Sequence, residues 1–153
     1  MTNFNKICVK NVKFGLDVEV FEPSNMYNCT LGNGVLIGPF CEIQSNVIVG
    51  DRTRIQSHSF ICEGVEIGAD CFIGHGVMFI NDTFSIGGPA NGNKSLWKVT
   101  KVGDQVSIGS NATILPVEIC DGTIIGAGAV VTKDIKIPGK YIGNPARRLK
   151  NED

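Results

Sequence analysis

Residues 31–79 read LGNGVLIGPFCEIQSNVIVGDRTRIQSHSFICEGVEIGADCFIGHGVMF, and a bulky apolar residue occupies every sixth position. These positions are Leu31, Ile37, Ile43, Val49, Ile55, Ile61, Ile67, Ile73 and Phe79. Side chains return to the same face after about 3.6 residues in a helix and about 2 in a strand. A fixed repeat of six residues is instead typical of a parallel β-helix. The sequence therefore predicts an all-β protein built as a parallel β-helix of hexapeptide repeats.

The repeat continues after an interruption, with one step shortened to five residues. Its later apolar positions are Val102, Ile108, Ile114, Ile119, Ile125 and Val131. The fourth residue after each apolar position is mostly small or β-branched, and the first is often glycine. We interpret the former as an inward position near a corner and the latter as a position that needs unusual backbone angles. Eighteen residues should complete one three-sided coil, so that Ile37, Ile55 and Ile73 stack. A β-sandwich would instead show a period of two.

The 153 residues are predicted to form a single domain. We expect an irregular lead-in segment at 1–30, coils at 31–81 and 102–136, an excursion loop at 82–101, and a C-terminal cap and tail at 137–153. The loop breaks the period with glycines and carries the only tryptophan, Trp97. A long irregular loop in a compact domain is usually functional, so we expect it to dock on its own coil or on a neighbouring chain. A short helix after Pro145 is expected to cap the last coil.

The composition argues against several classes of partner. Charged residues make up 19% of the chain and the net charge is −1, so no broad basic field exists to attract nucleic acid. No apolar run approaches the roughly 20 residues of a membrane span, which favours a soluble, cytoplasmic protein. The six cysteines form no C-x-x-C pair, and Cys41 and Cys71 fall on small inward positions. We therefore expect free thiols and no bound metal.

Several segments carry a family resemblance. The repeats, together with IGAGAVVTKD at 125–134 and GNPA at 143–146, resemble the left-handed β-helix acyltransferases of the hexapeptide-repeat family. PFCEIQ at 39–44, SHSFIC at 57–62, GHGVMFIND at 74–82 and WKV at 97–99 are similar to the branch that N-acetylates UDP- or dTDP-linked 3-amino sugars for bacterial surface polysaccharides such as lipopolysaccharide. Those relatives tend to carry Pro-Arg soon after Asn-Asp, where this chain has TFSIGG at 83–88. The exact sugar and nucleotide therefore stay open.

The resemblance implies an acetyl-CoA-dependent transferase that is a homotrimer, with the acyl-CoA lying in grooves between adjacent β-helices. An O-acetyltransferase acting on a sugar or serine hydroxyl, with His75 as base, is an alternative. A non-catalytic β-helix scaffold is a second alternative. A β-helix carbonic anhydrase would need three zinc-binding histidines, and the chain has only His58 and His75.

His75 and Asn81 are the candidate catalytic residues. Each lies two residues past an apolar repeat position, where a corner points its side chain outward. They are one repeat apart, and six extended residues span up to about 20 Å, so a single coil should not bring them together. Acting on one substrate, they would come from different subunits. We expect Asn81 to orient the attacking amine, and His75 to act as the base or as a hydrogen-bond donor to the thioester.

Spacing by eighteen places further polar residues on the same corners, with Ser45, Glu63 and Asn81 on one ridge and Pro39, Ser57 and His75 on another. The candidate substrate-binding residues are Glu42, Ser57, His58, Glu63, Asp82 and Phe84. The resemblance implies that Trp97 and the small residues of the last coils hold acetyl-CoA, with their backbone amides along its pantetheine arm. These small residues are Ser107, Gly109, Asn111 and Ala127. Lys133, Arg147 and Arg148 are expected to meet the phosphates of CoA through charge-assisted hydrogen bonds. The alternative interpretation is that these polar residues bind no ligand and simply form solvent-exposed edges of the coil.

Overall fold

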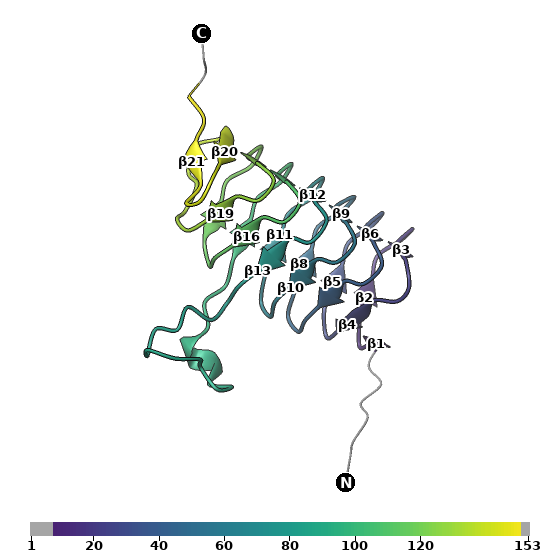
Figure 1. Ribbon diagram of the computed structural model, residues 1–153. Helices are drawn as coiled ribbons and strands as arrows, with labels where there is room; N and C mark the ends of the chain where they lie inside the picture. The colour runs from purple at the N-terminus through teal and green to yellow at the C-terminus, as the bar shows by residue number, and fades with distance from the viewer. Residues whose placement is uncertain (1–7, 151–153) are drawn as a thin grey trace.

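The computed structural model describes residues 8–150, which wind into a parallel β-helix with three flat faces (Figure 1). Each face is a sheet of short strands, and from β1 to β19 consecutive strands of the chain belong to successive sheets. The sheets, named A, B and C here, have seven, six and eight strands. The first coil, β1 to β3, lies at one end of the stack and β20 to β21 at the other. The predicted parallel β-helix is confirmed.

The strands are mostly two residues long. Sheet A contains β1 (Val9–Lys10), β4 (Asn25–Tyr27), β7 (Glu42–Ile43), β10 (Phe60–Ile61), β13 (Met78–Phe79), β16 (Thr113–Ile114) and β19 (Val130–Val131). Sheet B contains β2 (Lys13–Phe14), β5 (Thr30–Leu31), β8 (Ile48–Val49), β11 (Glu66–Ile67), β14 (Lys101–Val102) and β17 (Glu118–Ile119). Sheet C contains β3 (Glu19–Val20), β6 (Leu36–Ile37), β9 (Arg54–Ile55), β12 (Phe72–Ile73), β15 (Ser107–Ile108), β18 (Ile124–Ile125), β20 (Lys140–Ile142) and β21 (Arg147–Arg148).

The apolar repeat positions form the core. Ile37 pairs with Ile55, and Ile55 pairs with Ile73, in parallel register on sheet C, which confirms the predicted stacking. The bulky positions from Leu31 to Val131 are all buried, as are the small residues four positions later. Burying one such aliphatic side chain contributes about 1.5–3 kcal/mol. The six-residue period therefore reflects one inward side chain per face of the coil.

The role predicted for the repeat glycines is wrong. The glycine directly after an apolar position does not have a positive φ; instead the next coil lies too close for a side chain. A Cβ at Gly50 would lie 2.5 Å from the carbonyl carbon of Gly68. The positive φ angles occur two residues later, for example at Arg52 (57°), His58 (64°) and Asn111 (59°). The chain turns each corner through this left-handed residue.

The coils begin earlier than predicted. Residues 1–30 were expected to be an irregular lead-in, but β1, β2 and β3 pair in parallel with β4, β5 and β6. Val9 pairs with Met26 and Phe14 with Leu31. The steps from Val9 to Phe14 and from Met26 to Leu31 are five residues, so a search for strict sixes misses this coil. The part of the lead-in segment at 1–7 lies outside the described residues.

The C-terminal cap also differs from the expected helix. β20 continues sheet C beside β18, and β21 folds back antiparallel to β20, with Tyr141 opposite Arg148. Ala146 donates its backbone N–H to the Val130 carbonyl at 2.8 Å, so the turn between the two strands also covers the edge of sheet A. This hairpin, not a helix, ends the coil. Within residues 8–150, no helix has the length and apolar character to cross a membrane.

The buried cysteines make the stability of the fold fall as the pH becomes alkaline. Burial raises the pKa of Cys62 to about 12 and that of Cys29 to about 11, against about 8.5 for a thiol in an unfolded chain. Only the unfolded chain ionises these thiols between those values, so their contribution is complete below about pH 8.5 and is lost above it. We expect the free energy of unfolding in urea to fall between pH 8 and pH 10, by on the order of 1 kcal/mol per pH unit for each thiol. In Cys62→Ala the fall should be shallower, whereas Cys8→Ser, at an exposed thiol, should follow the native protein. Parallel curves for Cys62→Ala and the native protein would contradict this assignment.

Candidate functional site

The corner between sheets C and A, called the C–A ridge here, carries both histidines. Ser57 and His75 occupy the same corner position in successive coils, and the Ser57 Oγ lies 2.9 Å from the His75 Nδ1. His58 stacks on Phe40, with ring centroids 4.9 Å apart and planes inclined by 29°. Four side chains from three successive coils thus form one continuous surface. Spacing by eighteen predicted that Ser57 and His75 share a ridge, and the structure adds a direct contact between them.

The C–A ridge continues into the positions expected to hold acetyl-CoA. Gly109, Asn111 and Ala127 follow His75 on this ridge over the next two coils, and Ser107 precedes them on β15. Their backbone amides are not all available. Asn111 donates its N–H to the His75 carbonyl, and Gly109 donates to the Ile125 carbonyl, both at 2.8 Å. Ser107 donates to Thr123 at 2.9 Å. The expectation that a run of amides lines the pantetheine arm is therefore wrong for these three residues.

The amides at the corner position of this ridge remain open. Within residues 8–150, the N–H groups of Ser110 and Ala127, like those of Ser57 and His75, have no hydrogen-bond acceptor. Ser110 and Ala127 occupy the corner position that His75 occupies one or two coils earlier, so these amides follow the line of the ridge. Ala127 was a predicted cofactor residue; Ser110 was not singled out by the sequence. The signal that distinguishes them is the coil-to-coil hydrogen-bonding pattern, which depends on register.

The opposite corner of sheet A, called the A–B ridge here, anchors the excursion loop. The Lys94 Nζ contacts both carboxylate oxygens of Glu63, at 2.7 and 2.8 Å, and lies 5.6 Å from the Trp97 ring centroid. Lys94 begins the short 3₁₀ helix η1 (Lys94–Leu96), which Asn93 caps by accepting the N–H of Ser95. The loop projects from the side of the coils (Figure 1), and the ion pair of Lys94 with Glu63 connects η1 to the coils of its own chain. Glu63 thus anchors the loop, and Lys94 is the partner that the sequence did not identify.

Asp82 and Asn81 have different roles at the start of the loop. The Asp82 carboxylate accepts the N–H of Phe84 at 2.9 Å and that of Ala90 at 2.7 Å. Asp82 therefore fixes the shape of the loop. Both of its carboxylate oxygens already accept a hydrogen bond from the loop, so the structure gives Asp82 a structural role and not a direct contact with substrate. The side-chain amide of Asn81 makes no hydrogen bond within the described part of the chain, while its carbonyl accepts the N–H of Lys98. The Phe84 side chain is exposed.

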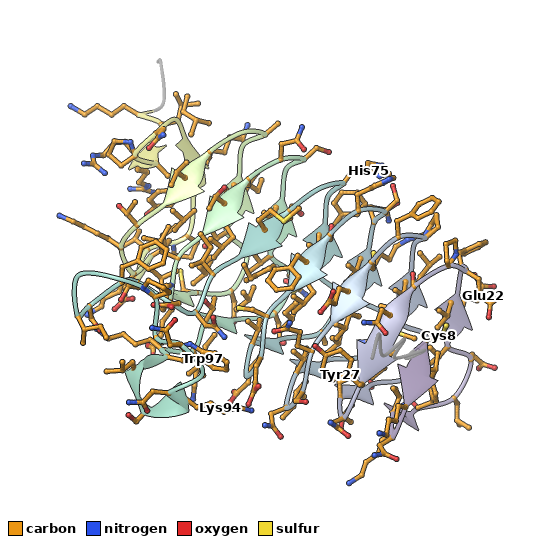
Figure 2. All side chains as sticks on the ribbon, turned by 60° about the horizontal axis from the view of Figure 1, so that its bottom comes forward. Cys8, Glu22, Tyr27, His75, Lys94 and Trp97 are labelled. Carbon is orange, nitrogen blue, oxygen red and sulfur yellow. The ribbon has the colours of Figure 1, made fainter. Side chains whose placement is uncertain are left out.

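His75 and Asn81 do not meet within one chain. They lie on the C–A and A–B ridges, and sheet A with strand β13 lies between them. Figure 2 shows His75 on the opposite edge of the molecule from Lys94 and Trp97. This matches the separation expected from their spacing. A site that uses both residues needs a second copy of the chain.

Glu42 lies on the face of sheet A and forms hydrogen bonds with Tyr27 and Gln44. Of these three residues, the sequence singled out only Glu42 as a candidate for substrate binding. Its Oε1 accepts the Tyr27 hydroxyl at 3.1 Å and the Gln44 Nε2 at 3.0 Å. Burial, followed by the charge of Glu42, raises the pKa of Tyr27. Tyr27 stays protonated and donates to the carboxylate over the ordinary pH range. Glu42 is therefore held in one orientation.

The three basic residues assigned to phosphate binding come together at the C-terminal end. Lys133, Arg147 and Arg148 line one pocket of about 290 Å³, with Tyr141 and Ala146. The Arg148 Nη2 donates to the Pro138 carbonyl at 3.1 Å and the Arg147 Nη1 to the Ala146 carbonyl at 3.0 Å. Asp134 also lines the pocket, and its Oδ1 accepts the N–H of Glu118 at 3.0 Å. Three cations and one carboxylate leave the pocket net positive, which suits a phosphate group. The hairpin of β20 and β21 creates this arrangement.

The sequence matches two family models. The bacterial transferase hexapeptide model (six repeats) matches residues 28–63, and the model of the hexapeptide repeat of succinyl-transferase matches residues 99–133. A chloramphenicol acetyltransferase from Agrobacterium fabrum (strain C58) is 42% identical over 52 residues, which cover 33% of this chain and 25% of that protein. The chain spans about a third or less of the length of the curated relatives it matches.

Solved structures share the fold over a longer range. The N-acyltransferase AntD from Bacillus cereus, solved as a mutant with dTDP and coenzyme A, matches with a TM-score of 0.72 at 22% identity, covering 93% of this chain and 83% of that one. A mutant of perosamine N-acetyltransferase from Caulobacter crescentus, solved with CoA and GDP-perosamine, matches with a TM-score of 0.67 at 22% identity, covering 92% and 58%. Likeness at this level of identity shows the fold.

Proposed function

We propose that this chain, whose repeats match the hexapeptide models of bacterial transferases, is an acetyl-CoA-dependent N-acetyltransferase acting on a nucleotide-linked amino sugar. The observation that carries the proposal is the continuity of the C–A ridge. It runs from His75 through the open amides of Ser110 and Ala127 to the turn of the C-terminal hairpin, where Ala146, Arg147 and Arg148 line the basic pocket, and Lys133 enters that pocket from the A–B corner. A candidate base and a candidate phosphate pocket are thus connected by one ridge of the coil.

The dimensions of this ridge suit an extended thioester. From His75, three further coils lead to β20 at the cap, and neighbouring parallel strands are about 4.8 Å apart, so the ridge extends about 14 Å. The pantetheine arm of CoA would lie along it, with its phosphates at the basic pocket and its acetyl group near His75. The two open amides would meet the amide carbonyls of the arm. The described residues contain no group of three metal-ligating side chains, and this reaction needs no metal.

The proposed chemistry is direct transfer. The neutral amine of the sugar attacks the thioester carbonyl, a carbon–nitrogen bond forms, and the carbon–sulfur bond breaks to release CoA as thiolate. The nitrogen loses one proton to His75, and the thiolate takes up a proton as the site returns to its starting state. His75 is the base in this scheme, and the unbonded side-chain amide of Asn81, from a neighbouring subunit, orients the amine.

This shared site is the reason to propose a homotrimer, in which the groove between two β-helices brings one chain's His75 toward the neighbour's Asn81. The exposed loop residues Phe84 and Ile86 are then available for the neighbouring chain. Native mass measurement should give three chains. A monomer with full activity would overturn the shared site.

The substrate proposal rests on two solved relatives of the same fold, one holding dTDP with coenzyme A and one holding GDP-perosamine with CoA. The test is a panel of UDP- and dTDP-linked 3-amino and 4-amino sugars with acetyl-CoA. The readout is the mass of the product, because a thiol reagent that detects released CoA would also react with the exposed thiol of Cys8. Each amino sugar is paired with its hydroxyl counterpart. Acetylation of the amine alone supports the proposal. Transfer to the hydroxyl favours an O-acetyltransferase with the same base, and no transfer at all favours a scaffold.

Lys133 should bind a phosphate of CoA without taking part in the chemistry. Within residues 8–150 its ammonium group has no acidic partner. We expect Lys133→Ala to raise the KM for acetyl-CoA about tenfold, the effect of losing one charge-assisted hydrogen bond, with kcat nearly unchanged. The matched control is acetyl-dephospho-CoA, which lacks the 3′-phosphate. If Lys133 meets that phosphate, the native enzyme should bind the analogue less well and Lys133→Ala should not distinguish the two donors. An unchanged KM in the variant would remove Lys133 from the site.

A further inference from the structure

The contact between Ser57 and His75 is built into the coil. The Ser57 carbonyl accepts the N–H of Gly76 at 3.0 Å, and the Pro39 carbonyl accepts the N–H of His58 at 3.1 Å. These backbone hydrogen bonds fix the height of each corner above the previous one. The two side chains therefore face each other because of the register of the helix, and the 2.9 Å distance from the Ser57 Oγ to the His75 Nδ1 follows from it.

The imidazole of His75 has one ring nitrogen engaged and one open. Its Nδ1 contacts Ser57, and its Nε2 has no hydrogen-bond partner within residues 8–150. A neutral imidazole carries one N–H donor and one acceptor nitrogen, and a hydroxyl can serve as either partner. The hydroxyl of Ser57 therefore decides which proton arrangement the open nitrogen presents.

The two arrangements differ in what happens when Nε2 takes up a proton. If Nδ1–H donates to the Ser57 Oγ, the Nε2 lone pair faces outward, and the same hydrogen bond persists after protonation because Nδ1 still carries its proton. If the hydroxyl donates to Nδ1, Nε2 already carries a proton and cannot act as a base. The first arrangement alone needs no rearrangement during proton uptake.

We propose that Ser57 is a positioning residue whose Oγ accepts the Nδ1–H of His75 and holds the tautomer with its Nε2 lone pair facing the reactant. This inference rests on the proposed role of His75 as base. Ser57 was expected from the sequence to bind substrate directly, whereas here it acts through the histidine. An uncharged partner also orients the ring without adding a carboxylate beside an anionic nucleotide.

Nitrogen-15 NMR of the imidazoles tests the tautomer without any substrate. The chain has two histidines, so a His58→Gln variant assigns both sets of signals. His58 serves as an internal reference, because its ring stacks on Phe40 and makes no hydrogen bond within the described residues. We expect neutral His75 to be protonated at Nδ1, and to shift toward the Nε2–H form in Ser57→Ala but not in Ser57→Thr. Alanine fits this corner, since Ala127 occupies the equivalent position. An Nε2–H tautomer in the native protein, or no change in Ser57→Ala, would overturn the inference.

Kinetics supply the second readout. In Ser57→Ala we expect kcat to fall about tenfold through loss of orientation, with the KM for acetyl-CoA within twofold, and Ser57→Thr should recover most of the loss. Unchanged kcat in Ser57→Ala would count against the positioning role. The two proposals fail separately. If the protein is active but the His75 tautomer does not change in Ser57→Ala, only this inference is wrong. If the native chain acetylates no sugar, the proposed function is wrong and the NMR result still stands.

Discussion

The His75→Asn variant should lose at least about 100-fold in kcat/KM for the amino-sugar substrate. General-base catalysis contributes about 10²–10⁴-fold, and within residues 8–150 no other imidazole contacts Ser57 or occupies this corner position. Asparagine still offers the Ser57 Oγ an amide group close to the position of Nδ1 but has no group that can take up a proton. The fold should survive, because the His75 backbone keeps its hydrogen bond with Asn111. Steady-state kinetics with the best substrate of the panel provide the measurement.

Glu66→Gln is a suitable control for that experiment. Glu66 lies on sheet B, the face opposite the C–A ridge, and its carboxylate is 3.8 Å from the Lys101 Nζ. An exposed ion pair of this kind contributes little to stability, so activity and melting temperature should both match the native protein. If His75→Asn keeps kcat/KM within about tenfold of native, His75 is not the base. The amine would then need only positioning, and Asn81 would become the residue to replace.

Gly50→Ala should destabilise the protein by about 3 kcal/mol, near the upper end of the usual cost of overpacking a close contact. The new Cβ would lie 2.5 Å from the Gly68 carbonyl carbon and 2.6 Å from the Ala69 nitrogen. Both are backbone atoms, so no side chain can rotate to relieve the contact. In a stacked-coil protein each coil is stabilised by its neighbours. Gly50 and Gly68 belong to adjacent coils inside the stack, so the clash weakens the contact between those two coils. For a chain of this length the melting temperature should fall by roughly 10 °C.

Gly88→Ala is the matched control. Gly88 lies in the excursion loop, has no atom within 4 Å of a Cβ, and does not have a positive φ. Alanine should be neutral or slightly stabilising there, because it restricts the unfolded chain. Equal melting temperatures for the two variants would show that the repeat glycines serve some purpose other than coil spacing.

The geometry of the candidate site could be predicted only where it follows from the period. Spacing by eighteen placed Ser57 and His75 on one ridge, and spacing by six separated His75 from Asn81. It could not show that Ser57 contacts Nδ1, because that depends on side-chain rotation at the corner. Nor could it show that Lys94 binds Glu63, because the loop has no repeat that fixes its path. The amides of Gly109 and Asn111 were misassigned for a related reason: whether an N–H is open depends on which coil lies above it.

The step of five residues explains the missed first coil. Corners between sheets A and B vary in length, with five residues from Met26 to Leu31, six from Ile43 to Val49, and the whole loop between Phe79 and Val102. The corners from B to C and from C to A keep their length. Variation is tolerated at the A–B corner, so the strict period disappears there first.

The sequence by itself determined the parallel β-helix, its core and the order of residues along each ridge. These follow from a local rule, since every coil must present one bulky side chain per face to its neighbours. Tertiary structure decided which backbone amides are open, where the loop is anchored, and how the hairpin at residues 140–148 brings Lys133, Arg147 and Arg148 around one pocket. Those contacts join segments that no period relates, and their geometry is set by packing between whole coils.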